Sequence, residues 1–449
     1  MSRALIGLGL GLLVGLAATA PLGAATFTVT KIADSDDGVC DADCSLREAI
    51  NAANANSEDD HIDFAIPGAG VHTISPTSEL PPFAPGHAIF IDGGGSCGWP
   101  STMPTELDGH LAGTAEGLRL LGDQDYVYGL VINRFATGDG IEIQGDADFV
   151  FCSFVGTDST GTQALPNFNG IRVGGSNAFV GGPRFPLGSG SPNLISGNTE
   201  AGIRVDANGS VAVDFNWIGT NGVEQTGALG NGGAGVYFAD GSSGSSVRHN
   251  TIAHNGAGAV WVYGDTTHGI SVWNNSTFDN GGIAIDLVGS LAQVGPTPND
   301  PGDADEGPNR LQNYPALEGA TVGADAGHGG FALRVRYRVD SDPANAAYPI
   351  DVVFYRREAL GDGGDAYVGA ALYSESQFAP GMPVTAELQG SVPPASVGDV
   401  IIATATDADG NTSEFTPGGV TVDEAPATAA GLAVLGVLAL YGRSRMARH

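Results

Sequence analysis

The chain has almost no lysine and few basic residues of any kind. Lys31 is its single lysine, and lysine and arginine together number 18 against 50 aspartates and glutamates, so the formal net charge is −32 at pH 7. A field of this sign repels phosphate backbones and bare polyanions. The composition therefore excludes nucleic acid as a partner. It suits divalent cations and neutral or cationic partners, although solvation of an exposed surface also explains it.

Cysteine is scarce as well. None of the four cysteines has the spacing of a zinc site. In an exported protein they are free to form disulfides, and four cysteines allow three pairings. Proximity in the sequence favours Cys40 with Cys44, which leaves Cys97 with Cys152.

Several catalytic signatures are missing. The sequence has no nucleophilic Ser/His/Asp order, no glycine-rich phosphate loop and no metalloprotease helix. It is rich in glycine, with 70 residues that lack the three-residue period of collagen, and its 42% of apolar residues is too high for a disordered chain. This mixture predicts many short strands joined by tight turns.

The N-terminal residues 1–25 have the order of a signal peptide. Arg3 is followed by an apolar stretch over residues 4–20 and by small residues up to Ala25, where cleavage is expected. The mature chain would begin near Thr26, and an uncleaved anchor is the alternative. We expect the protein to be exported to the cell surface or the extracellular medium.

The C-terminal residues 423–449 resemble a second targeting segment. An acidic start precedes the uncharged residues 427–441, and three arginines follow: Arg443, Arg445 and Arg448. A full membrane span needs about 20 apolar residues, so this one is short. Basic residues after a span stay on the cytoplasmic side. The order is typical of bacterial C-terminal sorting tails, and a plain membrane anchor is the alternative.

A short helix is predicted at residues 45–54. Ser45 and Glu48 form a capping box, which satisfies free backbone donors at a helix start. The apolar residues that follow share one helical face: Leu46, Ala49, Ile50 and Ala53. The acidic loop before the helix either shapes this turn or binds Ca²⁺.

Residues 40–54, with the run Cys-Ser-Leu-Arg-Glu-Ala, resemble the N-terminal module of bacterial secreted right-handed parallel β-helix repeat proteins. The resemblance implies that residues 26–100 cap such a solenoid and form its first coils. A cap is needed because an open solenoid end exposes core and unpaired strand edges.

Residues 101–315 carry the repeats expected of the solenoid body. A glycine followed by alternating apolar residues recurs at positions 140, 170, 202, 235, 258 and 282, so the spacings are 30, 32, 33, 23 and 24 residues. The shorter spacings fit one coil, and the longer ones fit a coil with an insert. Two related inserts, residues 155–167 and 218–231, would lie on one face, which is often the binding face of a repeat protein.

Polar and aromatic side chains within the repeats have separate interpretations. Asparagines just before several repeats predict a structural ladder: Asn198, Asn250, Asn255, Asn274, Asn275 and Asn280. Four aromatic residues are candidate contacts to a polysaccharide or cell-surface glycan, because exposed rings stack on sugar rings: Trp217, Trp261, Tyr263 and Trp273. The alternative for these four is that they fill the core or stack on one another.

The segment that leaves the solenoid is the candidate metal site. Its aspartates alternate beside a turn-forming glycine, as a hard cation such as Ca²⁺ prefers, although the twelve-residue EF-hand pattern is absent. The predicted Ca²⁺ ligands are Asp300, Asp303, Asp305 and Asn309. An Asp/Gly/Pro linker without a metal is the alternative.

The pattern changes at about residue 329. Several short alternating stretches over residues 329–422 predict an immunoglobulin-like β-sandwich. The whole chain is thus predicted to be all-β: a right-handed parallel β-helix with an N-terminal helical cap, followed by the sandwich domain.

Two classes of function fit these features. A non-catalytic adhesin or glycan-contact protein is favoured, because the repeats contain no lysine, no Asp-Asp pair on a strand and no Arg-x-Lys. Pectate-lyase-like and polygalacturonase-like sites need such groups. A polysaccharide lyase or glycoside hydrolase is the alternative, and it rests on fold analogy alone. Its residues would come from polar groups on late coils: Arg248, His249, His254, Asp265, His268 and Asp286.

Overall fold

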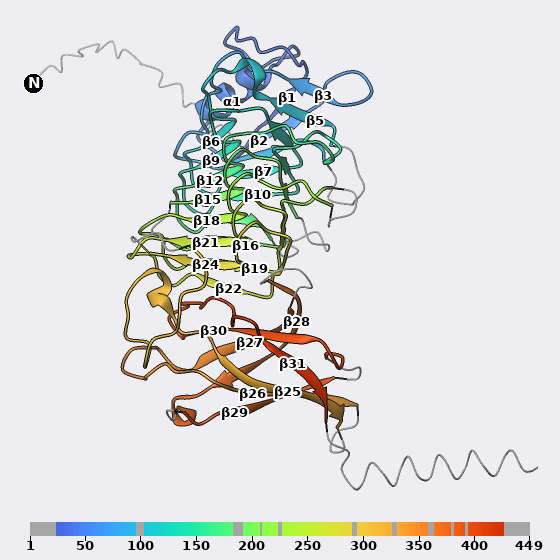
Figure 1. The fold of residues 1–449 in the computed structure, drawn as a ribbon. Coiled ribbons are helices and arrows are strands. Elements are labelled where there is room, and N and C mark those ends of the chain that lie inside the picture. Colours follow the sequence, from blue (N-terminus) through green and yellow to red (C-terminus); the bar gives the residue numbers. More distant parts are fainter. Residues whose placement is uncertain are drawn as a thin grey trace, which may run out of the picture.

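The computed structural model describes residues 24–95, 103–182, 192–206, 209–222, 227–289, 294–325, 330–357, 363–378, 381–390 and 394–425. Almost all of the predicted signal peptide and sorting tail lies outside the described residues. Within the described part, no helix is long and apolar enough to cross a membrane. The chain forms a stack of three parallel sheets, followed by a second body of mostly antiparallel strands (Figure 1).

Three sheets of short parallel strands build a solenoid, and successive coils add their strands in order. Sheet A contains β1 (Thr26–Val29), β2 (Asp60–Phe64), β4 (Ile89–Asp92), β7 (Tyr126–Tyr128), β10 (Phe149–Phe151), β13 (Phe179–Gly181), β16 (Ala212–Asp214), β19 (Ser246–Arg248) and β22 (Ser271–Trp273). Sheet B contains β3 (His72–Ile74), β5 (Thr105–Asp108), β8 (Val131–Asn133), β11 (Phe154–Val155), β14 (Leu194–Ile195), β17 (Trp217–Ile218), β20 (Thr251–Ala253) and β23 (Ser276–Phe278). Sheet C contains β6 (Leu118–Leu120), β9 (Ile141–Ile143), β12 (Ile171–Val173), β15 (Ile203–Val205), β18 (Val236–Phe238), β21 (Val260–Tyr263) and β24 (Ile285–Val288). The chain is therefore a parallel β-helix, as predicted, and its right-handed sense stays a prediction.

Alternation along each three-residue strand fixes which side chains form the core. The inward residue of six successive sheet A strands is valine: Val127, Val150, Val180, Val213, Val247 and Val272. In sheet C the first and third residues point inwards, so Ile171 and Val173 are buried on either side of Arg172. Full burial of each such side chain stabilises the fold by about 1.5–3 kcal/mol.

The glycine that marks each repeat has a packing role. A Cβ added to Gly140 would lie 2.7 Å from the carbonyl oxygen of Gly170, and a Cβ on Gly170 would lie 2.5 Å from that of Gly202. Successive coils approach too closely at this corner for any side chain. The repeat signature therefore records backbone contact between coils.

Two ladders of buried asparagines connect the coils at the other corners. Between sheets A and B the Nδ2 group of each asparagine donates to the Oδ1 of the next, at 2.9–3.0 Å: Asn193, Asn216, Asn250 and Asn275. Between sheets B and C the same pattern runs at 2.9–3.1 Å: Asn167, Asn198, Asn231, Asn255 and Asn280. The predicted ladder is confirmed, except that Asn274 lies outside it and donates its backbone N–H to the Tyr355 hydroxyl.

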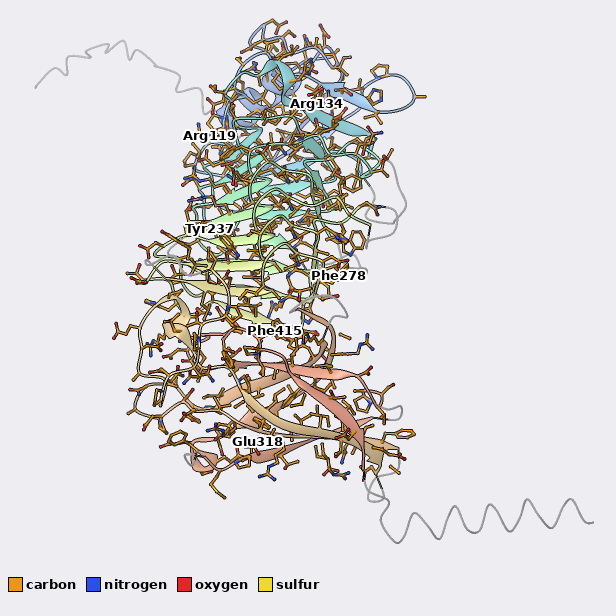
Figure 2. All side chains as sticks on the ribbon, in the orientation of Figure 1. Arg119, Arg134, Tyr237, Phe278, Glu318 and Phe415 are labelled. Atoms are coloured by element: carbon orange, nitrogen blue, oxygen red, sulfur yellow. A yellow bond between two sulfur atoms is a disulfide. The ribbon has the colours of Figure 1, made fainter. Side chains whose placement is uncertain are left out.

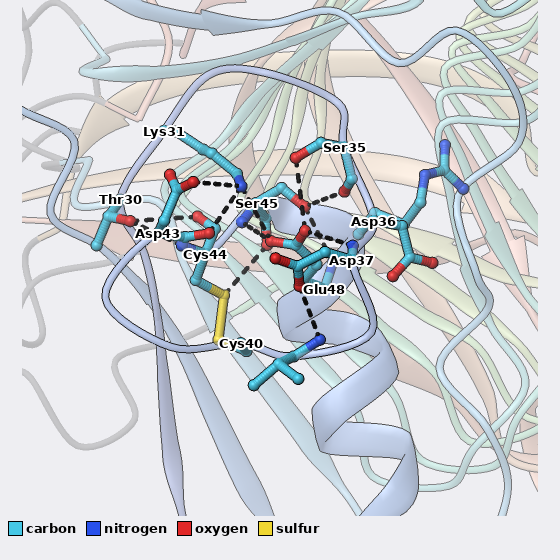
Figure 3. Close-up of polar contacts among 12 residues, drawn as sticks. Thr30, Lys31, Ser35, Asp36, Asp37, Cys40, Asp43, Cys44, Ser45 and Glu48 are labelled. Atoms are coloured by element: carbon cyan, nitrogen blue, oxygen red, sulfur yellow. Dashed lines mark hydrogen bonds and ion pairs between the residues drawn. A yellow bond between two sulfur atoms is a disulfide. The ribbon is translucent and has the colours of Figure 1, made fainter.

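The helix α1 (Leu46–Ala55) begins with the predicted capping box. Glu48 donates its backbone N–H to Ser45 Oγ at 3.1 Å, and the Glu48 carboxylate accepts the Ser45 N–H at 2.7 Å. Lys31 Nζ lies 3.3 Å from carboxylate oxygens of both Asp43 and Glu48 (Figure 3). The apolar face of α1 joins the solenoid core, and the role of this segment as a cap stays a prediction.

A disulfide between Cys40 and Cys44 closes the loop before α1 (Figure 3). This pairing was predicted from the sequence and is confirmed. Cys152 is also disulfide-bonded, and its predicted partner, Cys97, lies outside the described residues.

The C-terminal body has seven strands in the order β28-β27-β30-β31-β25-β26-β29. Their bounds are β25 (Ala316–Ala324), β26 (Phe331–Arg338), β27 (Ile350–Arg357), β28 (Gly364–Tyr373), β29 (Val384–Gly390), β30 (Val400–Thr406) and β31 (Val420–Glu424). Strand β31 pairs with β30 on one side and with β25 on the other, so it joins two half-sheets. Both half-sheets supply one core, which includes Leu333, Phe354 and Ile401. The immunoglobulin-like connectivity of this sandwich stays a prediction.

The predicted start of this domain at residue 329 needs correction. Strand β25 begins at Ala316 and pairs along its length with β26. Small residues dominate β25, so its sequence lacks the alternation that marks the later strands. The last strand, β31, also extends to Glu424, beyond the predicted end at residue 422.

The sandwich covers the last coil of the solenoid. Phe415 packs against the solenoid core and lies 5.2 Å, ring to ring, from Tyr355 (Figure 2). The Glu414 carboxylate accepts the backbone N–H groups of Leu287 at 3.1 Å and of Thr297 at 2.7 Å. The described part also contains three short 3₁₀ turns: η1 (Gly109–Leu111), η2 (Pro308–Leu311) and η3 (Glu375–Gln377).

Candidate functional site

The four aromatic residues predicted to contact a glycan do not gather on one surface. Trp217 lies on β17 of sheet B, Trp261 and Tyr263 lie on β21 of sheet C, and Trp273 lies on β22 of sheet A. Trp217 packs on a satellite apolar cluster beside sheet B, and Nε1 of Trp261 is buried. One sugar chain therefore cannot contact all four along a single face.

The outer face of sheet A carries a stack of rings that sequence reasoning missed. Strand register places five rings in one column, here called the aromatic column: His61, Phe90, Tyr126, Phe149 and Phe179. Successive ring centroids lie 4.9, 5.7, 4.5 and 5.0 Å apart, and the last two pairs are almost parallel, at 7° and 5°. The signal was present in the sequence, because each ring occupies the outward position next to an inward Ile or Val of its strand.

The aromatic column ends at Phe179. Its partner in register on the next coil is Ala212, and Ser246 and Ser271 follow. One face of the Phe179 ring therefore has no ring of the column against it, and Phe179 is 38% exposed. Rings within a stack cover one another's faces, so the free face of Phe179 is the part of the column best placed to stack on a ligand.

A polar cluster lies beside these small residues on the same face. Asp214 Oδ2 accepts from Arg248 Nε at 2.9 Å, and Asp214 Oδ1 lies 2.9 Å from His249 Nδ1. Phe215 stacks on the His249 ring at 4.6 Å and 9°, and the Trp273 ring meets it edge-on at 5.0 Å. The Asp214 side chain is only 4% exposed, whereas those of Arg248 and His249 are 35% and 27% exposed. The buried carboxylate thus orients two partly exposed hydrogen-bonding groups.

A separate acidic pocket of about 370 Å³ lies where the solenoid meets the sandwich. Its lining includes the predicted ligands Asp303 and Asp305 together with Asp265 and His268. Carboxylate oxygens of Asp300, Asp303 and Asp305 all lie within 4.8 Å of one another, which is close enough to share one cation. The structure therefore brings three of the four predicted Ca²⁺ ligands together.

The carboxylates of this pocket favour binding of a cation. Burial, with mutual repulsion between the carboxylates, raises the pKa of Asp303 to about 7 and that of Asp305 to about 6. Asp303 accepts three hydrogen bonds, from Ser341, Gln312 and Asn313. Oδ1 of Asp305, in contrast, is buried without a hydrogen-bond partner.

Asn309, the fourth predicted ligand, forms structural hydrogen bonds instead. Its Nδ2 donates to the carbonyl oxygens of Ile270 at 2.8 Å and Thr412 at 2.9 Å, and its Oδ1 accepts the Ile270 N–H at 3.0 Å. Asn309 is completely buried. It therefore continues the hydrogen bonding of the last coil and ties it to the sandwich.

The six polar groups proposed for a catalytic site are separated in space. Arg248 and His249 lie on the sheet A face, whereas Asp265 and His268 line the pocket at the domain joint. His254 lies at another corner, 5.5 Å from the Phe278 ring. Asp286 is fully buried on β24, and burial raises its pKa to about 6.

On the outer face of sheet C, the described arginines pair with acids, with Arg119 Nε 2.7 Å from Glu142 and Arg172 Nε 2.8 Å from Asp206. Arg204 lies over the Tyr237 ring at 5.0 Å, on the face where Figure 2 labels Arg119 and Tyr237. These arginines form structural ion pairs or ring contacts.

The strand pairing defines the class of this protein: a parallel β-helix with a C-terminal sandwich. No protein-family model and no curated protein matches the sequence. Among solved structures, pectate lyase Pel9A is 15% identical with a TM-score of 0.29, over 58% of this chain and 71% of that one. The enzymatically active domain of bacteriophage CBA120 tailspike protein 2 is 8% identical with a TM-score of 0.30, over 87% and 76%. Dettilon tailspike protein is 10% identical with a TM-score of 0.26, over 85% and 92%. At these scores the likenesses carry no argument about function.

Proposed function

We propose that this chain is an exported cell-surface or secreted protein that binds a glycan along the outer face of sheet A without cleaving it. The membrane would be contacted only through residues 423–449, before or instead of processing. The observation that carries the proposal is the aromatic column, which ends in a free ring face at Phe179.

A line of rings that is partly exposed along its length and exposed at both ends, His61 and Phe179, needs a physical explanation. Large apolar surfaces in contact with water mark interaction sites, and rings combine a large apolar area with little side-chain entropy to lose. Strands in a sheet are spaced about 4.8 Å apart, so the column offers a regular apolar track along the solenoid axis. An extended, neutral sugar chain fits such a track better than a polyanion does, because the molecule carries a net charge of −32.

The binding test uses defined oligosaccharides. Cellohexaose, mannohexaose and hexagalacturonate would be titrated into the protein by calorimetry, and reducing sugars and unsaturated products would be assayed in the same samples. The double variant Phe149→Ala/Phe179→Ala is expected to lower affinity for a neutral hexamer at least tenfold. Phe168→Ala, which removes an equally exposed ring away from the column, serves as the matched control.

Two results would contradict this proposal. One is a hexamer affinity that is unchanged in the double variant. The other is product formation, which would support the lyase or hydrolase alternative. Asp265→Ala and His268→Ala would then show whether the reaction takes place in the acidic pocket between solenoid and sandwich, here called the joint pocket.

We also propose that the joint pocket binds Ca²⁺ through Asp300, Asp303 and Asp305. A cation held there would stiffen the connection between solenoid and sandwich. Binding to the folded state alone adds about 2.7 kcal/mol of stability at a concentration 100 times the dissociation constant. Ca²⁺ is therefore expected to raise the unfolding temperature, and chelator is expected to reverse the effect.

The control for Ca²⁺ matches the change in charge. Asp305→Asn is expected to abolish the Ca²⁺-dependent rise in unfolding temperature, measured by differential scanning calorimetry. Asp351→Asn, at an exposed position on β27, should leave it intact. An equal rise in wild type and Asp305→Asn would show that Ca²⁺ acts elsewhere.

A further inference from the structure

We propose that Arg248 and His249 form a subsite that recognises two adjacent hydroxyl groups of a neutral pyranose. This inference rests on the proposed glycan binding and names the part of the surface that selects the sugar.

Asp214 fixes the chemistry of the subsite. Its buried carboxylate lies 2.9 Å from His249 Nδ1. In the tautomer that donates a hydrogen bond from Nδ1 to Asp214, the lone pair is on Nε2, on the opposite side of the ring. Asp214 also holds Arg248 through Nε alone, at 2.9 Å. The terminal nitrogens of the guanidinium remain as donors.

The exposed groups are therefore complementary to a vicinal diol. One hydroxyl donates to His249 Nε2 while its neighbour accepts from Arg248, which gives each sugar oxygen a partner of the correct polarity. The formal charges of Asp214 and Arg248 cancel, so this pair adds no net charge to the subsite. The subsite therefore supplies hydrogen bonds without attracting a carboxylated sugar.

Position on the face links the subsite to the aromatic column. Strand β19, which carries Arg248, is two strands beyond β13, which carries Phe179, and that separation is about 10 Å at the usual strand spacing. In the ring column, Ala212 on β16 follows Phe179, and Ser246, on the same strand as Arg248, comes next. Trp273 follows Arg248 in register and closes the far side. A sugar chain stacked on Phe179 would thus extend over small residues to the polar groups.

The test compares sugars that differ at one hydroxyl. Cellohexaose and mannohexaose differ in the orientation of the C2 hydroxyl, so the ratio of their affinities reports recognition of neighbouring hydroxyls. His249→Phe keeps a ring against Phe215 but removes Nε2. It is expected to weaken binding of the preferred hexamer about tenfold and to bring the affinity ratio towards one, while Phe168→Ala changes neither value.

The outcomes separate the two proposals. If the Phe149→Ala/Phe179→Ala variant loses binding but His249→Phe keeps both affinity and ratio, the subsite is overturned and glycan binding stands. If wild type binds no hexamer, both proposals fail. If His249→Phe abolishes formation of a cleaved product, His249 is a catalytic residue and the subsite as a purely binding site is overturned.

The unfolding temperature of His249→Phe should remain close to that of wild type. If it does not, Arg248→Gln, which keeps a donor but removes the charge, provides a second variant.

Discussion

Buried aspartates occupy the corner before sheet A on three coils. Asp125 Oδ1 accepts the Ile89 N–H at 2.8 Å, and Asp148 Oδ1 accepts the Asp125 N–H at 2.8 Å. Asp60, Asp125 and Asp148 each have a buried Oδ2 without a hydrogen-bond partner. Burial, helped by repulsion from neighbouring carboxylates, raises the pKa of Asp125 to about 7 and that of Asp148 to about 8. A protonated carboxyl has one O–H donor beside an acceptor oxygen, so it partly reproduces an asparagine amide, which has two N–H donors and forms the ladders at the other two corners.

This residue-scale feature predicts how stability depends on pH. The folded-state pKa of Asp148 lies above its unfolded value of about 3.9, so the folded state holds more protons between these values. The contribution of Asp148 to stability is therefore fully present below its unfolded-state pKa and is lost as the pH rises towards 8. Asp148→Asn is expected to remove part of this fall and to stabilise the protein at pH 8 by on the order of 2 kcal/mol. Urea unfolding at pH 5 and pH 8 would measure it.

The control for this prediction is Asp351→Asn, at an exposed position on β27. Asp351 lies in the C-terminal body, away from Asp148 and its neighbouring carboxylates, so this substitution should leave the pH dependence contributed by Asp148 unchanged. A wild-type protein equally stable at pH 5 and pH 8 would show that Asp148 is ionised in the fold.

Among the elements, the asparagine ladders set the register of the coils. Each Asn bridges neighbouring coils, and its Nδ2 also donates to a backbone carbonyl of the preceding coil, as Asn250 does to Val213 at 2.9 Å. Between sheets A and B the ladder therefore supports a very tight corner, as at His249 and Asn250, which alone separate β19 from β20. Its members share partners, so loss of one leaves polar groups of its neighbours buried and unpaired.

Asn250→Ala, in the middle of a ladder, should destabilise the protein by about 3 kcal/mol, because Asn216 and Asn275 both lose a partner. Asn280→Ala, at the partly exposed end of the other ladder, should cost about 1 kcal/mol. The midpoint of urea unfolding reports both values. Equal costs would mean that the ladder does not act as a connected network.

In the whole molecule, the sandwich and the solenoid share one interface at the last coil. The Thr412 hydroxyl accepts the Val272 N–H at 2.9 Å, and Asn411 accepts the Gly269 N–H at 2.8 Å. Burial raises the pKa of Glu414, at the same interface, to about 7. These contacts satisfy strand edges that a bare solenoid end would expose.

Calorimetry should therefore show one cooperative unfolding transition for the described body. Phe415→Ala removes the ring that contacts both bodies, and we expect it to separate unfolding into two transitions and to lower the first by several degrees. Phe331→Ala, at an exposed site on β26, is the control. Two transitions in wild type would instead show that the bodies unfold independently.

Local patterns in the sequence were sufficient for the repeating parts of the molecule. Close backbone contact explains Gly140 and Gly170, alternation explains the inward valines, and the spacing of Ser45 and Glu48 explains the start of α1. These features depend on residues near one another in the chain or one coil apart. The same reasoning missed β25, whose small residues show no alternation. It also assigned Asn309 to the metal site, although the buried side chain of Asn309 forms structural hydrogen bonds instead.

The surface sites were decided by tertiary structure. Tyr126, Phe149 and Phe179 form one column only because strand register aligns coils of unequal length, which spacing alone does not reveal. Asp214 meets His249 on the neighbouring coil, and the pocket between solenoid and sandwich brings Asp265 and His268 to Asp303 and Asp305. The sequence by itself determined a β-helix with an acidic exit loop. Which side chains share a face was determined only by the three-dimensional stacking of the coils, because that stacking sets the distances between residues that are far apart in the chain.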